Sequence, residues 1–260
     1  MMDNPQKSSL MSYIFTYNLV NKNNVTVSID GQGADEIQGG YIFYLIHHFS
    51  NLNIRSVIPE VHRFVNLKHS YKYIIYGLIL NLIRRIGLKK PWVYLLKVLK
   101  LPLNPFLSIN ERLKNDISGN LINLLHYGDR GAMASSIESR FPFLDYRLVE
   151  FWISLPNSSK ISLGWTKFLA RQTFSERLPE KITWRKHKLG WAMPEEYWFK
   201  TELKEMVIDV IYGSVFLKQF KLPNCKKILN SKKSNRKQVN KVIKFYNLAL
   251  WHEIFFEENK

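Results

Sequence analysis

Residues 25–29 form a β-branched run, VTVSI, that leads directly into a glycine turn, DGQG, and then into a helical pattern that begins ADEIQ. Asparagines before the run and an aspartate after it are typical of the ends of a short strand. The sequence therefore predicts a strand, a tight turn and a helix start in direct succession. Gly31 and Gly33 allow close backbone approach, and N–H groups at a helix start face an anion, so this turn is the sharpest candidate for a phosphate site.

Asp35 and Glu36 follow the turn immediately. They would place carboxylates beside a bound anion, which makes chemical sense if a divalent cation bridges phosphate oxygens to the protein. The turn is neither a Walker loop nor a dinucleotide fingerprint, because it contains no GxxxxGK[ST] and no GxGxxG. An ordinary helix N-terminus, whose first-turn acids are favoured by the helix dipole, remains the alternative on this pattern alone.

The rest of the chain is predicted to be mostly helical. Apolar periodicity and proline punctuation place helices at residues 8 to 20 and near residues 60 to 85, 91 to 100, 108 to 126, 144 to 155, 166 to 177 and 239 to 256. A polar stretch, Lys226 to Lys241, is predicted to be a surface loop before the last helix. Because a lone strand cannot hold a sheet, either its partners lie outside this chain or the chain is more helical than an α/β fold.

A second candidate segment is Tyr127 to Phe151, in which acidic and basic residues alternate among small residues. Alternating charges usually form a salt-bridged surface. Small residues also leave room for a ligand, and pairs of arginine and carboxylate side chains can hold an amino-acid head group. The alternating charges are carried by Asp129, Arg130, Glu138, Arg140, Asp145 and Arg147.

A third candidate segment, GWTKFLAR, contains Lys167. Thr166 is predicted to cap the following helix, which would place Lys167 in its first turn, where a cation is slightly unfavourable. Lys167 is then best understood if it contacts an anion, the alternative being a solvated surface lysine. The loop that follows is basic around Gly190, and its Lys186 and Lys188 suit a segment that closes over a phosphate.

The positive charge is concentrated in two segments. The chain has 38 Lys and Arg against 21 Asp and Glu, a formal charge of +17. Residues 61–110 hold nine basic and no acidic residues, and residues 210–252 hold ten and none. Subtracting these 19 from 38 leaves 19 basic against 21 acidic residues, so the remainder of the chain is nearly neutral.

Three explanations of those basic segments compete. Nucleic-acid binding is disfavoured because no nucleic-acid motif is present and 26 Lys against 12 Arg is a poor match to base readout. Contact with a membrane surface is suggested by apolar runs that alternate with basic residues between Tyr71 and Lys100, although Tyr73 to Ile83 is far shorter than the ~20 residues of a membrane span. A solvated basic helix face is the explanation that we favour.

Cysteine and metal chemistry are restricted. The single Cys225 excludes an intramolecular disulfide, and no Cys/His cluster has metal-ligand spacing. The opening MMDNPQKSSL is polar and has no apolar stretch of the kind found in secretory signals. We therefore expect a cytoplasmic protein.

Four ordered motifs together resemble a known family: DGQGADEIQGGY, DRGAMASSIESRFPFLDYRLVEF, GWTKFLAR and LPEKITWRKHKLGWAMP. In this order they are similar to the synthetase half of glutamine-dependent asparagine synthetases. The resemblance runs from about Asp3 to Trp198 and is weakest over residues 51–121. It implies an α/β, mostly helical fold: the C-terminal part of an adenine-nucleotide alpha-hydrolase-like, pyrophosphate-loop ATPase domain that lacks its first strands.

The resemblance also implies a reaction and roles for individual residues. Members of the family activate a carboxylate, usually that of aspartate, with ATP and Mg²⁺, and ammonia derived from glutamine then attacks the acyl-adenylate. Gly31 and Gly33 match nucleotide-contacting backbone, Asp35 matches a carboxylate that helps hold Mg²⁺ and pyrophosphate, and Lys167 matches a lysine that stabilises charge on the phosphates. Asp129, Glu138 and Arg140 match the region that lines the substrate pocket, and Lys186 and Lys188 of the basic loop are expected at the same phosphates. Gln32 stands where many members have a Glu thought to assist proton transfer, and an amide cannot take that proton.

The departures from the family pattern shape what we expect of the chain. It contains no N-terminal glutaminase cysteine and no SGGxDS pyrophosphate loop. We expect the chain, a partial asparagine synthetase domain with a basic variable insertion near 54–110 and a basic C-terminal region near 210–260, to be inactive alone. A separate polypeptide would supply the missing parts. The alternatives are a non-catalytic remnant, a basic surface-binding module, or a related amidotransferase acting on a glycan or peptide carboxylate.

Overall fold

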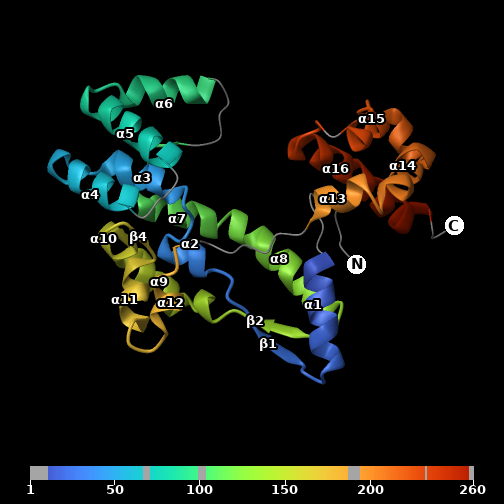
Figure 1. The fold of residues 1–260 in the computed structure, drawn as a ribbon, viewed down its shortest axis with the longest axis horizontal. Helices are drawn as coiled ribbons and strands as arrows, with labels where there is room; N and C mark the ends of the chain where they lie inside the picture. The colour runs from blue at the N-terminus through green and yellow to red at the C-terminus, as the bar shows by residue number, and fades with distance from the viewer. Residues whose placement is uncertain (1–10, 67–70, 99–103, 187–193, 232, 258–260) are drawn as a thin grey trace. The chain divides into compact units, whose positions relative to one another are not determined.

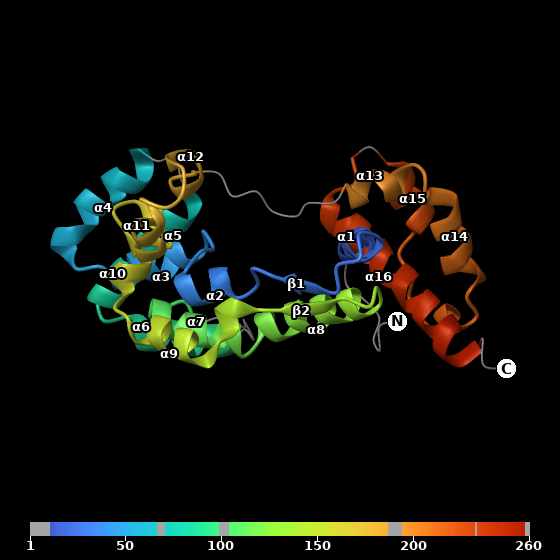
Figure 2. The same ribbon diagram turned by 90° about the horizontal axis from the view of Figure 1, so that it is seen from below.

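The computed structural model describes residues 11–66, 71–98, 104–186, 194–231 and 233–257 and is mostly helical (Figures 1 and 2). Its first part contains α1 (Met11–Lys22), β1 (Val27–Ile29), α2 (Ala34–Gln38), α3 (Tyr44–Asn51), α4 (Ile54–Asn66), α5 (Tyr71–Arg85), α6 (Lys89–Val98), α7 (Ile109–Ile117), α8 (Asn120–Met133) and β2 (Glu138–Arg140). The chain continues with η1 (Pro142–Leu144), α9 (Tyr146–Ser154), α10 (Asn157–Lys160), β3 (Ile161–Ser162), β4 (Trp165–Thr166), α11 (Phe168–Phe174) and α12 (Glu180–Thr183). It ends with α13 (Glu195–Lys200), α14 (Lys204–Gly213), η2 (Phe216–Gln219), α15 (Cys225–Asn230), α16 (Arg236–His252) and the π-helical turn η3 (Glu253–Glu257).

The strand predicted at 25–29 is confirmed as β1, and it has a partner inside the chain. β1 pairs with β2, a three-residue strand in the charged segment that the sequence analysis did not predict to be a strand. The Glu138 N–H donates to the Thr26 carbonyl at 2.8 Å, and the Asp30 N–H donates to the Arg140 carbonyl at 2.8 Å. The described residues thus form two sheets of two strands each, β1–β2 and β3–β4.

The chain divides into two compact units, each with its own core. Unit 2 comprises residues 28–126 and 139–188, of which 67–70, 99–103, 187 and 188 lie outside the described residues. Its core is the buried set Tyr44, Leu45, Phe49, Phe64, Ile74, Ile109, Leu113 and Ile161. Helices α3 and α5 lie side by side (Figure 1), and Gly77 permits their close approach because a Cβ there would lie 2.7 Å from the Phe49 Cβ.

Unit 1 comprises residues 1–27, 127–138 and 189–260, within which the described part starts at residue 11. Helices α13 to α16 enclose an apolar core that includes Val207, Leu217, Val239 and Val242, all fully buried. The polar stretch 226–241 is mostly helical, against the predicted loop. It contains most of α15 and the start of α16, which a capping box between Asn235 and Gln238 begins.

Three further details correct the sequence predictions. The pattern that begins ADEIQ does not continue as one helix: α2 ends at Gly39, whose φ is +69°, and α3 starts afresh at Tyr44. Pro59 lies inside α4 and not at a boundary. Thr166 is in strand β4 and caps nothing; Lys167 itself is the residue at the start of α11.

Among the described residues, no helix is long and apolar enough to cross a bilayer.

Candidate functional site

The glycine turn after β1 is built by one side chain and one close contact. The Gln32 N–H donates to the Asp30 Oδ1 at 3.0 Å, which closes a local turn. Gly33 has φ +89°, and a Cβ there would lie 2.3 Å from the Leu144 Cδ2. Gly33 is therefore required for both its backbone conformation and its packing, whereas Gly31 faces open space.

The second glycine pair places a carboxylate. The Gly40 N–H donates to the Asp35 carbonyl at 2.9 Å and so closes the end of α2. A Cβ on Gly40 would lie 1.8 Å from the Asp35 Oδ1 and 2.4 Å from the Lys167 Cε. Glycine at position 40 thus leaves the space in which the aspartate and lysine side chains meet.

Lys167 reaches this space from the β3–β4 hairpin. In the hairpin Ile161 pairs with Thr166 and Ser162 with Trp165, and both turn residues, Leu163 and Gly164, have positive φ, as a two-residue type I′ turn requires. Lys167 follows the hairpin with φ +53° and ψ +37°, a conformation that a long side chain rarely adopts. Such backbone persists only where surrounding contacts over-determine it.

The central observation is an ion pair between residues far apart in the sequence. The Lys167 Nζ lies 3.0 Å from the Asp35 Oδ1. The two side chains are 29% and 23% exposed, so solvent and small solutes reach the pair. An ammonium has three N–H donors and the pair uses one of them, which leaves donors for a second anion.

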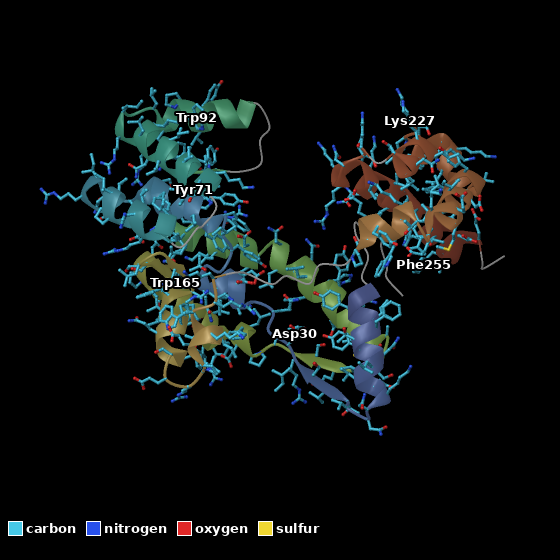
Figure 3. All side chains as sticks on the ribbon, viewed as in Figure 1. Asp30, Tyr71, Trp92, Trp165, Lys227 and Phe255 are labelled. Carbon is cyan, nitrogen blue, oxygen red and sulfur yellow. The ribbon has the colours of Figure 1, made fainter. Side chains whose placement is uncertain are left out.

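Arg171 fixes the backbone around Lys167. Its Nε donates to the Thr166 carbonyl at 2.8 Å, its Nη1 donates to the Thr183 carbonyl at 2.5 Å, and its guanidinium lies 4.9 Å from the centre of the Trp165 ring. Burial, and next the charge of Arg185, lower the pKa of Arg171 from its usual value. Figure 3 labels Trp165, the aromatic partner of this arginine. The arginine therefore ties the hairpin to the segment after α12.

A buried polar network lies behind Asp35. The Tyr41 hydroxyl donates to the Glu36 Oε1 at 2.7 Å, and the Tyr44 hydroxyl donates to the Asp116 Oδ2 at 2.8 Å. Arg112 binds the same Asp116 with two N–H groups. Burial, together with the neighbouring carboxylates, raises the pKa of Tyr41 and of Tyr44 far above the usual value, so both hydroxyls stay protonated as donors.

The structure brings some of the predicted site residues together and separates others. Lys167 and Asp35 are paired, and Gly31, Gln32 and Gly33 form the adjoining turn. Arg140 is the last residue of β2, where its carbonyl receives the Asp30 N–H.

The other predicted residues lie elsewhere. Asp129 and Glu138 are exposed residues of unit 1, whereas Lys167 and Asp35 belong to unit 2. Lys186 is exposed after α12, and no hydrogen bond or ion pair joins it to Asp35 or Lys167 within the described residues. Lys188 lies outside them.

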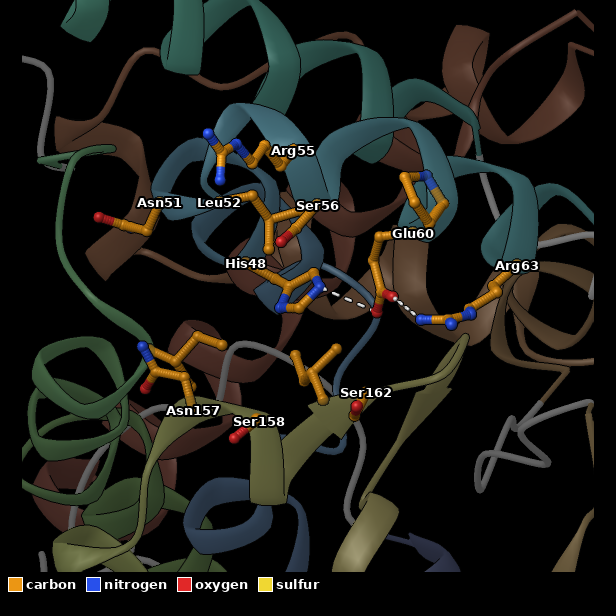
Figure 4. Close-up of a pocket in the computed structure, with 13 residues that line it drawn as sticks. His48, Asn51, Leu52, Arg55, Ser56, Glu60, Arg63, Asn157, Ser158 and Ser162 are labelled. Atoms are coloured by element: carbon orange, nitrogen blue, oxygen red, sulfur yellow. Dashed lines mark hydrogen bonds and ion pairs between the residues drawn. The ribbon is translucent and has the colours of Figure 1, made fainter.

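Sequence reasoning missed Gly40 and a separate polar pocket. The Gly39–Gly40 doublet was a visible signal, but its role depends on Lys167, which the pattern did not place there. The pocket, about 440 Å³, is lined by side chains of α3, α4 and α10 (Figure 4). In it the His48 Nε2 lies 3.3 Å from the Glu60 Oε1, and the Arg63 Nη1 lies 3.1 Å from the Glu60 Oε2. Glu60 and Arg63 lie three residues apart on α4, but no sequence spacing connects either of them to His48.

The Glu60 carboxyl shows opposing influences. Burial raises its pKa, but the hydrogen bonds from His48 and Arg63 outweigh burial, and the pKa ends below the usual 4.5. The glutamate is therefore held as a carboxylate. The lining of this pocket includes neither Asp35 nor Lys167, so the pocket is distinct from the ion pair.

The side chains near Asp35 fit a metal ion only if a bound ligand supplies further oxygen atoms to it. The described residues contain no group of three or more His, Cys, Asp or Glu side chains that could hold a metal ion. Mg²⁺ is commonly bound by one or two carboxylates together with water and substrate phosphates. Asp35 thus fits Mg²⁺ that arrives with a phosphate ligand, and not a metal held by protein side chains alone.

A lysine and an aspartate that are accessible together beside a glycine turn are the groups found in enzymes that handle nucleotide phosphates. Residues 1–253 match the family described as asparagine synthase, and the chain belongs to that family.

Individual relatives agree. The chain is 29% identical over 273 residues to asparagine synthetase [glutamine-hydrolyzing] 1 of Bacillus subtilis, an alignment that covers 91% of this chain and 42% of that protein. It is 39% identical over 77 residues to asparagine synthetase [glutamine-hydrolyzing] of Gallus gallus (27% of this chain, 14% of that protein). With the Homo sapiens protein of the same name it shares 37% over 78 residues (28% and 14%). The chain therefore spans less than half the length of these relatives, and no solved structure matches it.

Proposed function

We propose that the chain carries the Lys167–Asp35 part of an asparagine synthase-type site, in which ATP and Mg²⁺ activate the carboxylate of aspartate for attack by ammonia. The observation that carries the proposal is the ion pair at 3.0 Å, held by Gly40 and by the left-handed backbone of Lys167. Family membership supports ATP-dependent amidation in general. We further propose that the fold is the C-terminal part of an adenine-nucleotide alpha-hydrolase-like domain.

The side chains have different tasks in this proposal. Lys167 donates N–H groups to phosphate oxygens and offsets the negative charge that develops there, an electrostatic role that suits a compact ammonium. Asp35 orients that ammonium and offers carboxylate oxygen to Mg²⁺, which supplies Lewis acidity when bound. Gln32, whose amide cannot accept a proton, is limited to hydrogen bonding within the turn. The protein that supplies ammonia from glutamine is proposed to be a separate polypeptide.

Nucleotide binding by the chain itself is the first test. Titration of a fluorescent ATP analogue with Mg²⁺ is expected to show binding that Lys167→Ala weakens about tenfold, because a charge-assisted hydrogen bond is worth about 1.5–3 kcal/mol. Asp35→Ala is expected to remove the difference between binding with Mg²⁺ and with EDTA. Lys181→Ala, which alters an exposed lysine of α12, is the matched control and should bind like the original chain. Equal affinity of the Lys167→Ala and original chains would contradict the proposal.

Amidation is the second test. The chain is mixed with ATP, Mg²⁺, aspartate and glutamine, and with a second polypeptide that carries a glutaminase domain and an SGGxDS loop. Asparagine and pyrophosphate are expected in equal amounts, and Lys167→Ala should abolish both. Robust pyrophosphate release by the chain alone would refute its proposed dependence on the second polypeptide.

A further inference from the structure

Helix α5 presents an apolar stripe to solvent. Its opposite face packs on α3 through Ile74, Gly77 and Leu80, the two larger of which are at most 3% exposed. The stripe consists of five side chains that are each about half exposed: Tyr71 (52%), Ile75 (56%), Ile79 (48%), Leu82 (60%) and Ile86 (58%). Their spacing of four, four, three and four residues places them along one line. The first four lie on α5, and Ile86 lies in the turn that directly follows it, where its N–H donates to the Leu82 carbonyl at 3.0 Å. Figure 3 labels Tyr71 at the beginning of this line.

Cations without acidic partners flank the stripe. Lys72, Arg84, Arg85 and Lys90 are exposed, and none forms an ion pair within the described residues. The two arginines donate to neutral oxygens: Arg84 to the Asn51 side chain, and Arg85 to the Asn81 side chain and the Leu52 carbonyl. These hydrogen bonds fix the side chains but leave their charges uncompensated.

Among the described residues, Glu111 of α7 interacts with a basic residue that follows α5, Lys89. Lys89 contributes, after the hydrogen bonds from Ser108, to lowering the pKa of Glu111 in α7. Because residues 61–110 contain no acidic side chain, the surface of α5 as a whole is positive. A partner that binds this surface of α5 must therefore offer both an apolar region and negative charge.

The composition of the stripe discriminates between partners. A second copy of the chain, docked through the same stripe, would bring like charges together, which is destabilising. A nucleic-acid strand would be met by stacking aromatic side chains, whereas four of the five stripe residues are aliphatic. The 15-residue α5 is too short to span a bilayer, but it suits a helix that lies in the plane of the interface.

We infer that α5 docks on an anionic lipid surface, with the stripe in the acyl boundary and the flanking lysines and arginines against the headgroups. Apolar burial and electrostatic attraction act together in this arrangement, so neither alone should hold the chain on the membrane. The site is separate from Lys167 and Asp35 and does not depend on the proposed amidation.

Co-sedimentation of the purified chain with vesicles tests the inference. Binding is expected to vesicles of phosphatidylcholine with about one third phosphatidylglycerol and not to phosphatidylcholine alone, and salt should weaken it. Ile75→Ser with Ile79→Ser is expected to reduce partitioning at least about tenfold. Lys72→Gln with Lys90→Gln should reduce it about fivefold for each cation removed.

The control variant combines Ile122→Ser with Ile182→Ser, which alters two similarly exposed isoleucines, on α8 and α12 (56% and 58%). It should bind like the original chain, and circular dichroism should show equal helix content in all variants. Unchanged binding of the stripe variant, or equal binding to neutral vesicles, would overturn the inference. The inference would also be overturned if the chain bound RNA but not anionic vesicles. A dimer seen by light scattering in the original chain but not in the stripe variant would overturn it as well.

Discussion

Gly40 has no room for one more carbon atom. Gly40→Ala would place its methyl group against the Asp35 Oδ1 and the Lys167 Cε, so the ion pair must separate. Because these atoms end two flexible, partly exposed side chains, we expect the free energy of unfolding to fall by about 1 kcal/mol, the low end of overpacking costs, and nucleotide binding to weaken as in Lys167→Ala. Urea denaturation measures the first effect. Gly31→Ala, whose methyl group meets nothing within 4 Å, is the control and should stay within about 0.5 kcal/mol. Equal stability of the two variants would show that the pair is not confined as described.

Lys160 is the largest buried cation in the described core. It is 0% exposed, its Nζ donates to the Leu155 carbonyl at 2.7 Å, and burial lowers the pKa of its amine to about 8. The amine of Lys160 keeps its proton up to about pH 8 in the folded chain and up to about pH 10.5 in the unfolded chain. The free-energy cost of burying the charge is therefore full below pH 8 and disappears as the pH rises from 8 to 10.5.

Lys160→Met should therefore stabilise the protein at pH 7, by about 1–3 kcal/mol, with the advantage shrinking between pH 8 and pH 10.5. Urea denaturation across this pH range gives the difference, and Lys181→Met provides an exposed lysine as control. An advantage that is the same at pH 7 and pH 10.5 would mean that burial does not lower the pKa of Lys160, because a group with the same pKa in the folded and unfolded chain adds no pH dependence to stability.

The candidate site was predictable one residue at a time, but not as an arrangement. The sequence indicates Lys167 as a site residue because a cation in the first turn of a helix is best understood beside an anion. It indicates Asp35 because this carboxylate follows a glycine turn. The structure pairs them, although for a different local reason, since Thr166 is not the cap and Lys167 is left-handed. The sequence does not indicate the role of Gly40, because this role depends on contact with Lys167, a residue distant in the chain. Adjacency in the sequence carries no such information.

At the level of helices, α3 and α5 depend on one glycine. Alanine at position 77 would improve helix propensity by about 1 kcal/mol, yet its Cβ would lie 2.7 Å from the Phe49 Cβ and 2.9 Å from the Ile46 carbonyl oxygen. We expect the clash to dominate, so that Gly77→Ala lowers the free energy of unfolding by about 1–3 kcal/mol. Gly213→Ala, at the end of α14 with nothing within 4 Å, should be neutral or slightly stabilising. Thermal unfolding of both variants decides whether packing or propensity governs this helix pair.

Periodicity located most helices, and long-range contacts decided the exceptions. The strand β2 was hidden because ESR has no β-branched run and is a strand only through its bonds to β1. The sequence places Pro59 at a helix boundary, just before the helix predicted at 60 to 85, but α4 runs through it. Glu60 and Phe64 of this helix contact His48 and Phe49 of α3, and such tertiary contacts override the lost backbone bond.

For the whole molecule, two separate cores predict two unfolding transitions. The core of unit 1 is formed by α13 to α16, and that of unit 2 is formed around α3 and α5. Val242→Ala leaves a cavity in the core of unit 1, and Leu113→Ala leaves a cavity in the core of unit 2, each at a fully buried position. Each should lower the midpoint of one calorimetric transition and leave the other in place, since cavity costs of about 1–5 kcal/mol stay within a cooperative unit. A single transition that both variants shift equally would show that the units unfold together.

The left-handed backbone of Lys167 carries a consequence for directed evolution. Glycine adopts this conformation without the strain of about 1 kcal/mol or more that a side chain incurs. A library selected only for heat resistance should therefore enrich glycine at position 167, whereas a library selected for nucleotide binding should retain lysine. The divergence of the two libraries at one codon would measure how far chemistry, rather than folding, accounts for the lysine at this bend of the chain.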